Sequence, residues 1–174
     1  MIRILSGKLR GRKLKSINSS IVRPTQAKVR KSIMDSIRYF TDKDVLDLFC
    51  GTGALGFEAL SRGANTVKFV DNNFKVMSLI KENINNLDIL ERVKLIKLDA
   101  MKFLKNDINF YDLIFADPPY DSFTFNDLVP LISKILKKNG LFCYESNKNN
   151  KLQLLDNMKI KQYGNTQVIL WEKK

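Results

Sequence analysis

The sequence has 174 residues and a net charge of +12, with 44% hydrophobic residues, two cysteines and no histidine. This composition excludes a disordered chain or a membrane protein, and the length predicts a single buried core. Without histidine, Ser-His-Asp catalysis and the usual zinc sites are excluded, so we expect no metal. No secretory signal is visible and both thiols are expected to be reduced, which favours a cytoplasmic location.

The first 43 residues carry most of the excess positive charge. They contain twelve Lys or Arg and two acids, a net +10, whereas residues 44–174 contain eighteen and sixteen, a net +2. Such clustering is typical of a protein that binds a polyanion, and it argues against a uniformly basic surface. We therefore expect a basic extension over residues 1–43, packed on a core domain over residues 44–174. Phosphate contacts are expected from Lys8, Arg10, Arg12, Lys13, Arg23, Lys28 and Arg30.

The order of the predicted elements indicates an α/β fold. A short hairpin is expected over residues 2–5 and 12–14, followed by a helix over 26–39. Further strands are predicted at 45–49, 66–70, 93–98, 111–116 and 141–145, with helices at 53–62, 74–86, 101–104 and 126–137. Segments 158–162 and 167–172 are predicted to form a final antiparallel pair. The alternation predicts a mostly parallel seven-stranded sheet with a C-terminal antiparallel strand, covered by helices on both faces.

A glycine-rich turn follows the first core strand, in the sequence Asp47-Leu48-Phe49-Cys50-Gly51-Thr52-Gly53-Ala54-Leu55-Gly56. Its glycines match G-x-G-x-x-G and Asp71 follows Gly51 by twenty residues, which read literally is a dinucleotide-binding pattern. Asp47 argues against a dinucleotide, because a carboxylate at this turn would repel a pyrophosphate. The same carboxylate suits a cationic cofactor, and S-adenosylmethionine carries both an ammonium and a sulfonium.

Two further acids are predicted at successive strand ends. Asp71 would accept hydrogen bonds from ribose hydroxyls, and Asp99 from an adenine amino group beside the Ala100 N–H. Each acid taken alone is better explained as a helix cap or a solvated loop residue, but the three together favour a binding site. The residues expected at the cofactor are Asp47, Phe49, Gly51, Gly53, Asp71, Asp99 and Ala100.

The tetrapeptide Asp117-Pro118-Pro119-Tyr120 follows the apolar run 111–116, which reads as a buried parallel strand. Ligands of open α/β sheets bind at the carboxyl ends of strands. Two prolines remove two backbone donors and leave carbonyls available as acceptors. A carboxylate and a carbonyl suit an –NH2 group, and the Tyr120 ring suits a nucleobase. The alternative is a loop that merely ends a strand.

Together these residues resemble the class I S-adenosylmethionine-dependent methyltransferases, with their Rossmann-like fold, and more closely the RsmD-like 16S rRNA guanine-N2 methyltransferases. The resemblance spans residues 3–14, Arg23-Pro24-Thr25 with Val29-Arg30, residues 47–56, residues 117–120 and Tyr144-Glu145-Ser146. The chain departs from that family at Ala27 and Lys31, where acids are usual, at Asp35, where Asn is frequent, and at Asp71, where Glu is common.

The resemblance implies methyl transfer to the exocyclic N2 of a guanine in 16S rRNA, with Asp117, Pro118 and Tyr120 as the catalytic residues. It also implies a substrate within an assembling small ribosomal subunit. A monomer is the default expectation for a chain of this length without a spare domain. An adenine-N6 methyltransferase of RNA or DNA would share the tetrapeptide, and a non-catalytic RNA-binding assembly factor could share the fold. A protein glutamine methyltransferase would be expected to have Asn in place of Asp117, and an NAD-dependent oxidoreductase is disfavoured by Asp47.

Overall fold

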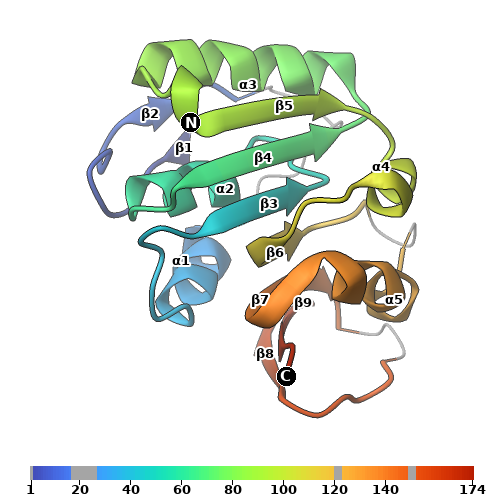
Figure 1. Ribbon diagram of the computed structural model, residues 1–174. Helices are drawn as coiled ribbons and strands as arrows, with labels where there is room; N and C mark the ends of the chain where they lie inside the picture. Colours follow the sequence, from blue (N-terminus) through green and yellow to red (C-terminus); the bar gives the residue numbers. More distant parts are fainter. Residues whose placement is uncertain (1, 17–26, 120–122, 149–151) are drawn as a thin grey trace.

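The computed structural model describes residues 2–16, 27–119, 123–148 and 152–174. A seven-stranded sheet runs through the molecule and separates two groups of helices (Figure 1). Its strands are β3 (Asp44–Leu48), β4 (Thr66–Asp71), β5 (Val93–Lys97), β6 (Tyr111–Ala116), β7 (Leu136–Asn147), β8 (Met158–Tyr163) and β9 (Thr166–Glu172). The helices are α1 (Ala27–Asp35), α2 (Ala54–Ser61), α3 (Phe74–Leu87), η1 (Leu90–Arg92), α4 (Ala100–Asn106) and α5 (Phe125–Ile135).

The strands lie in the order β5-β4-β3-β6-β7-β9-β8. Neighbouring strands from β5 to β7 are parallel, and β9 is antiparallel to both β7 and β8. The predicted α/β fold, with a mostly parallel seven-stranded sheet and a C-terminal antiparallel strand, is therefore confirmed.

The chain reverses its direction across the sheet between β3 and β6. It first leads outward from β3 through β4 to β5, and then returns to β6 on the other side of β3. In the parallel pair of β3 and β6, Leu48 lies opposite Ala116. Phe49 and Asp117 follow these two residues directly, so the glycine turn and the tetrapeptide begin side by side. This is the topological switch point at which α/β sheets bind ligands.

Each face of the sheet is covered by its own apolar cluster. Successive side chains of a strand point to opposite faces, so Val45 and Leu46 of β3 enter different clusters. The helices α2 and α3 pack on the face of Val45, and α4 and α5 pack on the face of Leu46. Burial on both faces explains why these strands are continuous apolar runs in the sequence.

The N-terminal residues share the core of the sheet. The strands β1 (Ile2–Arg3) and β2 (Lys13–Leu14) form the expected antiparallel hairpin, with Ile2 opposite Leu14. Both residues are buried in the same cluster as Ile33 of α1 and Phe57 of α2. In the part of the chain that the structure describes, no helix is both long and apolar enough to cross a membrane.

The two largest differences from the predicted boundaries are at the end of α1 and the start of β7. Helix α1 ends at Asp35 and not at residue 39, because the Ile37 N–H bonds to the Met34 carbonyl three residues back, 3.3 Å away, and the chain turns. Helix α5 ends at Ile135, and β7 begins at the next residue, Leu136, five residues before the predicted start of this strand. Backbone pairing of Leu136 with Tyr111 of β6 extends β7 toward the helix.

Candidate active site

The glycine turn lies at the carboxyl end of β3 and leads into α2. Phe49, Gly51 and Gly53 have positive φ angles of 53°, 50° and 71°, which Gly adopts without steric cost and Phe does not. The turn is closed by the Gly53 N–H, which donates to the Cys50 carbonyl at 2.7 Å. The backbone of this turn is therefore bent sharply at the sheet edge and available for close approach by a ligand.

Two glycines let α2 lie directly against the sheet. A Cβ on Gly56 would lie 2.4 Å from the Phe69 ring of β4, and one on Gly53 would lie 2.8 Å from the Phe57 ring. Real Cβ atoms do not approach other atoms so closely. The third glycine of the pattern thus serves helix–sheet packing, as it does in Rossmann folds.

Asp47 is a buried acid, with 3% of its surface exposed. Its Oδ2 accepts a hydrogen bond of 2.9 Å from the Gly56 N–H, which ties the acid to the start of α2. Burial raises the pKa of Asp47 well above its usual value; the Gly56 N–H lowers it, and the charges of Asp117 and Asp71 raise it further. Within residues 2–16, 27–119, 123–148 and 152–174, no Lys or Arg forms an ion pair with Asp47. A buried carboxyl group in this setting fits a cofactor that brings its own positive charge.

Asp71 ends β4 and is oriented toward the glycine turn. Its Oδ2 accepts from the Gly51 N–H at 3.2 Å, and its Oδ1 accepts from the Asn73 N–H at 2.9 Å. Asn73 in turn caps α3. A carboxylate has about four acceptor positions, so the two backbone contacts leave Asp71 able to accept bonds from ribose hydroxyls.

Asp99 and Ala100 lie at the start of α4. The Asp99 side chain accepts the Lys102 N–H at 3.0 Å and caps the helix. Ala100 is buried, and as the first residue of the helix its N–H has no partner within the helix. The capping role and the expected adenine contact are compatible, because capping uses one of the two Asp99 oxygens.

Asp117 and Pro118 leave the end of β6 beside this turn. Asp117 is half-buried, Pro118 is buried and Pro119 is exposed. The Asp117 charge raises the pKa of Asp47 and also that of the Cys143 thiol, although burial is the larger cause in both. The predicted catalytic carboxylate and the predicted cofactor acids therefore share one electrostatic environment. Tyr120 lies outside the described residues.

Phe123, a further aromatic residue at this edge, was missed by the sequence analysis. The Phe123 ring lies 5.5 Å from the Phe49 ring of the glycine turn, measured between centroids. The Tyr144 hydroxyl donates to the Phe123 carbonyl at 2.7 Å and so ties β7 to the segment before α5. Tyr144 belongs to the Tyr-Glu-Ser tripeptide noted in the sequence, which was the available signal. Phe123 carried none.

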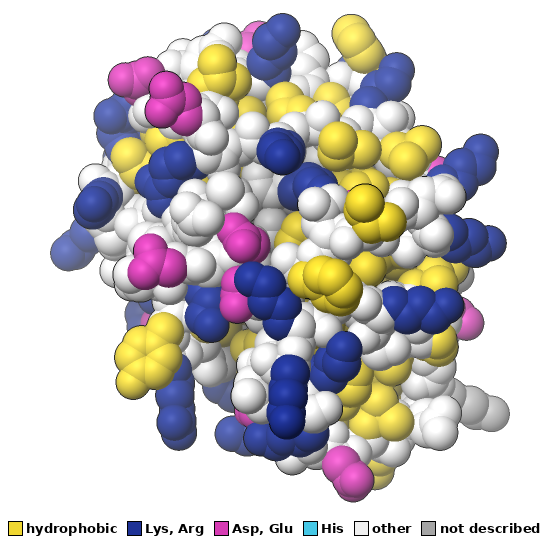
Figure 2. Space-filling model, in the orientation of Figure 1, with side chains coloured by type: hydrophobic (Ala, Val, Ile, Leu, Met, Phe, Trp, Pro, Cys, Tyr) yellow, Lys and Arg dark blue, Asp and Glu magenta, His cyan; other side chains and the backbone are white. Residues whose placement is uncertain are grey.

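The residues expected to bind phosphates do not all lie at the surface. Lys8, Arg10, Arg12, Lys13 and Lys28 are exposed, and Arg23 lies outside the described residues. Figure 2 shows Lys and Arg side chains over much of one face of the molecule, with fewer acids among them.

The prediction for Arg30 was wrong. Its side chain is 3% exposed, and its guanidinium Nη2 donates to the Arg3 carbonyl at 2.8 Å. Burial lowers the pKa of Arg30, and the nearby Glu58 charge raises it. Arg30 therefore joins α1 to the hairpin inside the protein, and its guanidinium does not face an RNA phosphate.

Comparisons with known proteins place these features in a family. The model of the family described as "Conserved hypothetical protein 95" matches residues 2–172. The Haemophilus influenzae protein named "Ribosomal RNA small subunit methyltransferase D" is 32% identical over 174 residues, covering 97% of this chain and 90% of the relative. The Bacillus subtilis protein named "Putative rRNA methyltransferase YlbH" is 36% identical over 158 residues, covering 87% and 85%.

A solved structure shows the same arrangement of the chain. The Escherichia coli protein described as "Putative methyltransferase yhhF" superposes with a TM-score of 0.88 at 28% identity, over 99% of this chain and 98% of that one. The similarity therefore includes the N-terminal hairpin as well as the sheet.

Proposed function

The chain belongs to this family of RsmD-like, S-adenosylmethionine-dependent methyltransferases, and we propose that it methylates the exocyclic N2 of a guanine in 16S ribosomal RNA. The observation that carries the proposal is the position of Asp117 beside the glycine turn, at the switch point of the sheet. The names of the relatives support ribosomal RNA as the substrate.

Three acids at strand ends supply the cofactor contacts in this proposal. S-adenosylmethionine, when bound, supplies a methyl group made electrophilic by its sulfonium. Asp47 would compensate the ammonium of the amino acid moiety, Asp71 would accept from the ribose hydroxyls, and Asp99 with Ala100 would hold the adenine. Phe49, Gly51 and Gly53 form the turn that would contact the cofactor.

Asp117 and the Pro118 carbonyl act on the methyl acceptor. The lone pair of an exocyclic amine is delocalised into the base, so the amine is a poor nucleophile. Two acceptors that hold its two hydrogens favour a pyramidal nitrogen, whose lone pair can then point at the methyl group. Positioning of this kind accounts for much of the rate enhancement in a reaction without covalent catalysis. In the proposal Tyr120 stacks on the guanine after it leaves its helix or loop.

The basic N-terminal extension, residues 1–43, provides the RNA contact in the proposal. Its exposed cations Lys8, Arg10, Arg12, Lys13 and Lys28 would neutralise phosphates. The proposed substrate is 16S rRNA within an assembling small subunit, and the enzyme acts as a monomer.

The substitution Asp117→Ala tests this assignment. We expect it to abolish methyl transfer to small-subunit RNA while the affinity for S-adenosylmethionine changes less than about threefold, because Asp117 contacts the acceptor. Transfer of labelled methyl and calorimetric titration of the cofactor measure the two properties. Asp156→Ala, at an exposed acid far along the chain, is the control. Loss of cofactor binding together with turnover would contradict the assignment.

An adenine-N6 methyltransferase is the second candidate. The observation in its favour is the tetrapeptide itself, because a carboxylate and a carbonyl hold any exocyclic –NH2 group equally well. The methylated nucleoside distinguishes the two candidates.

A further inference from the structure

The tip of the N-terminal hairpin, residues 7–11, lies at the end of the sheet opposite the candidate active site. The Lys8 N–H donates to the carbonyl of Ser61, the last residue of α2, at 2.7 Å. The Arg12 guanidinium donates to the carbonyl of Asn86, in the last turn of α3, at 2.5 Å. Both helices begin at the end of the sheet where the candidate active site lies and finish at the opposite end. Figure 1 shows β1 and β2 at that opposite end, near the tails of the strand arrows.

The distance between the two regions follows from the length of α3. This helix has 14 residues, and at a rise of about 1.5 Å per residue it spans about 20 Å. Asp71 and Asn73 of the candidate site lie at its first turn, and Asn86 with its Arg12 contact lies at its last.

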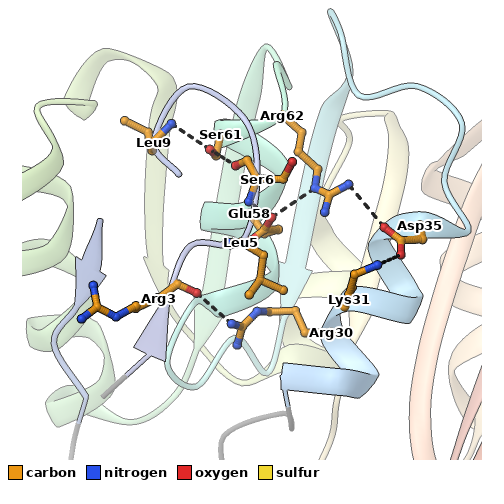
Figure 3. Close-up of polar contacts among 10 residues, drawn as sticks. All are labelled: Arg3, Leu5, Ser6, Leu9, Arg30, Lys31, Asp35, Glu58, Ser61 and Arg62. Atoms are coloured by element: carbon orange, nitrogen blue, oxygen red, sulfur yellow. Dashed lines mark hydrogen bonds and ion pairs between the residues drawn. The ribbon is translucent and has the colours of Figure 1, made fainter. Parts of the chain in front are cut away.

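The hairpin tip is held firmly by buried groups of α2 (Figure 3). Glu58 is 0% exposed, and its two carboxylate oxygens accept the N–H groups of Leu5 and Ser6 at 2.8 and 3.0 Å. The Ser61 hydroxyl accepts the Leu9 N–H at 2.9 Å and donates to the Ser6 carbonyl at 2.5 Å. These contacts bind the backbone of the hairpin, while the Lys8 and Arg10 side chains are exposed at its tip.

The close approach of the hairpin to α2 requires a glycine at position 7. Its φ is +80°, and a Cβ at this position would lie 1.9 Å from the Ser61 carbonyl oxygen. The turn therefore presses against the end of α2, with no room for a side chain between them.

The cations at the hairpin tip have no acidic partners within the described ranges. Lys8 and Arg10 of the tip, and Lys13 at the start of β2, are exposed and form no ion pair there, whereas the next lysine, Lys15, pairs with Glu82 at 3.1 Å. Glu58, which binds the backbone of Leu5 and Ser6 beside the tip, is already compensated by the Arg62 Nε at 3.1 Å. The hairpin tip is thus a fixed group of uncompensated positive charges, which suits phosphates.

We propose that the hairpin tip is a fixed second RNA contact, which holds a segment of the substrate at the opposite end of α3 from the candidate active site, about 20 Å away along the helix. The inference rests on the proposed function. At a rise on the order of 3 Å per base pair, about six base pairs of duplex span this distance, so the immediate neighbours of the target do not reach the tip. The substrate must then present RNA that lies several base pairs from the target, or a separate folded segment, at the tip. An isolated short strand with only the target and its immediate neighbours lacks this contact.

Cross-linking from the hairpin tip tests this arrangement. Cys50 and Cys143 are both buried, so Arg10→Cys introduces a selectively reactive thiol for a short photo-activated cross-linker. Lys159→Cys is the matched control, because Lys159 lies on β8, the edge strand of the sheet beyond β9. The labelled full-length enzymes are bound to small ribosomal subunits that lack the methyl mark, and primer extension locates the cross-linked nucleotides.

We expect the Arg10→Cys cross-links to fall on an RNA segment that is separate from the methylated nucleotide, and Lys159→Cys to give a different pattern. Cross-links confined to the target and its immediate neighbours, or no cross-links above the Lys159→Cys control, would overturn the inference.

Charge reversal adds a kinetic readout. The double substitution Lys8→Glu/Arg10→Glu is expected to raise KM for small subunits about tenfold or more, with kcat and cofactor affinity unchanged. An unchanged KM would also overturn the inference. Absence of methyl transfer by the unaltered enzyme to any ribosomal RNA would instead contradict the proposed function, so the two failures are distinguishable.

Discussion

Asp47 is the buried carboxyl group on which the proposed choice of cofactor rests. Its Oδ2 holds the start of α2 through Gly56, while burial and two neighbouring acids make its ionisation unfavourable. An anionic pyrophosphate would add to this repulsion, and an ammonium would relieve it. The same physical argument was available from the sequence, because the carboxylate immediately precedes the turn.

The raised pKa of Asp47 predicts that cofactor binding depends on pH. Binding a cationic ligand requires the ionised acid, so the affinity for S-adenosylmethionine should increase as the pH rises through the pKa of Asp47 in the free enzyme. In Asp47→Asn the affinity should be lower and this dependence should be lost. Calorimetric titrations at several pH values measure both effects, and the same pH dependence in Asp47→Asn would contradict the role of Asp47.

The stability of the cofactor-free protein should show the opposite trend. Folding raises the pKa of Asp47, so the folded state binds this proton more tightly than the unfolded state. The stability that this proton on Asp47 contributes to the folded protein is therefore present at low pH. It is lost as the pH rises from about 4 through the raised pKa of Asp47. The difference in melting temperature between Asp47→Asn and the unaltered protein should increase with pH in favour of the variant. A constant difference would contradict this account.

Arg30 and Lys28 are a matched pair on α1, one buried and one exposed. Arg30→Met should lower the free energy of unfolding by about 3 kcal/mol, because it removes the Arg3 contact and a positive charge beside buried Glu58. Lys28→Met should leave stability unchanged and weaken RNA binding. Urea denaturation and RNA titration measure the two properties. Equal stability of the two variants would contradict the structural role of Arg30.

The burial of Arg30 could not be predicted from the sequence. It lies in a segment with ten excess positive charges, and nothing local distinguishes it from Lys28. Its position is determined by Glu58 and by the hairpin backbone, which are 28 and 27 residues away along the chain. Glu58 itself was missed for the same reason, because its partners are backbone N–H groups of the hairpin.

At the scale of single elements, α2 connects the glycine turn of the candidate active site with the N-terminal hairpin. Its first turn follows the glycine turn and binds Asp47, and Glu58 and Ser61 in its second half hold the hairpin. The close packing of α2 on β4 through Gly56 therefore sets the position of both.

Gly56→Ala should disturb this packing. The new methyl group would overlap Phe69 and Val67, so the variant should lose about 1–3 kcal/mol of stability and bind the cofactor more weakly. Gly164→Ala is the control, because its φ of +58° adds strain but its Cβ would have open space. Thermal unfolding and cofactor titration measure both variants. A Gly56→Ala protein with unaltered cofactor affinity would contradict the role of this contact.

Ser61→Ala should loosen the hairpin. It removes the acceptor of the Leu9 N–H and the donor to the Ser6 carbonyl, at a cost of about 1–2 kcal/mol. Limited proteolysis should then cleave the variant faster between residues 5 and 13 than the unaltered protein. Ser133→Ala, on α5 at the other face of the sheet, is the control. Equal cleavage rates in all three proteins would show that Ser61 does not hold the hairpin.

The elements themselves were largely predictable, and their ends were less so. Strands buried on both faces, such as β3 and β6, appear as continuous apolar runs and were found. The start of β7 was missed because Lys137, Lys138 and Asn139 are polar and not fully buried. They belong to the strand because β7 pairs with its neighbours in the sheet, and a local sequence pattern does not indicate such pairing.

At the scale of the whole molecule, the uneven charge of the chain predicts salt-dependent RNA binding. Charge reversals at Arg10, Arg12 and Lys13 should weaken binding and lower the slope of log affinity against log salt by about one for each lost phosphate contact. Arg12 should contribute least, because its guanidinium already binds the Asn86 carbonyl. Lys138→Glu, outside the hairpin, serves as the control. An unchanged slope would show that the hairpin is not the RNA-binding surface.

The central claim is that this molecule places the N2 of a 16S rRNA guanine against the methyl group of S-adenosylmethionine. The most direct measurement is transfer of labelled methyl to purified small subunits and to naked small-subunit RNA, followed by identification of the product nucleoside. We predict N2-methylguanosine, formed more efficiently in the subunit. N6-methyladenosine, or no transfer to either substrate despite tight cofactor binding, would contradict the claim.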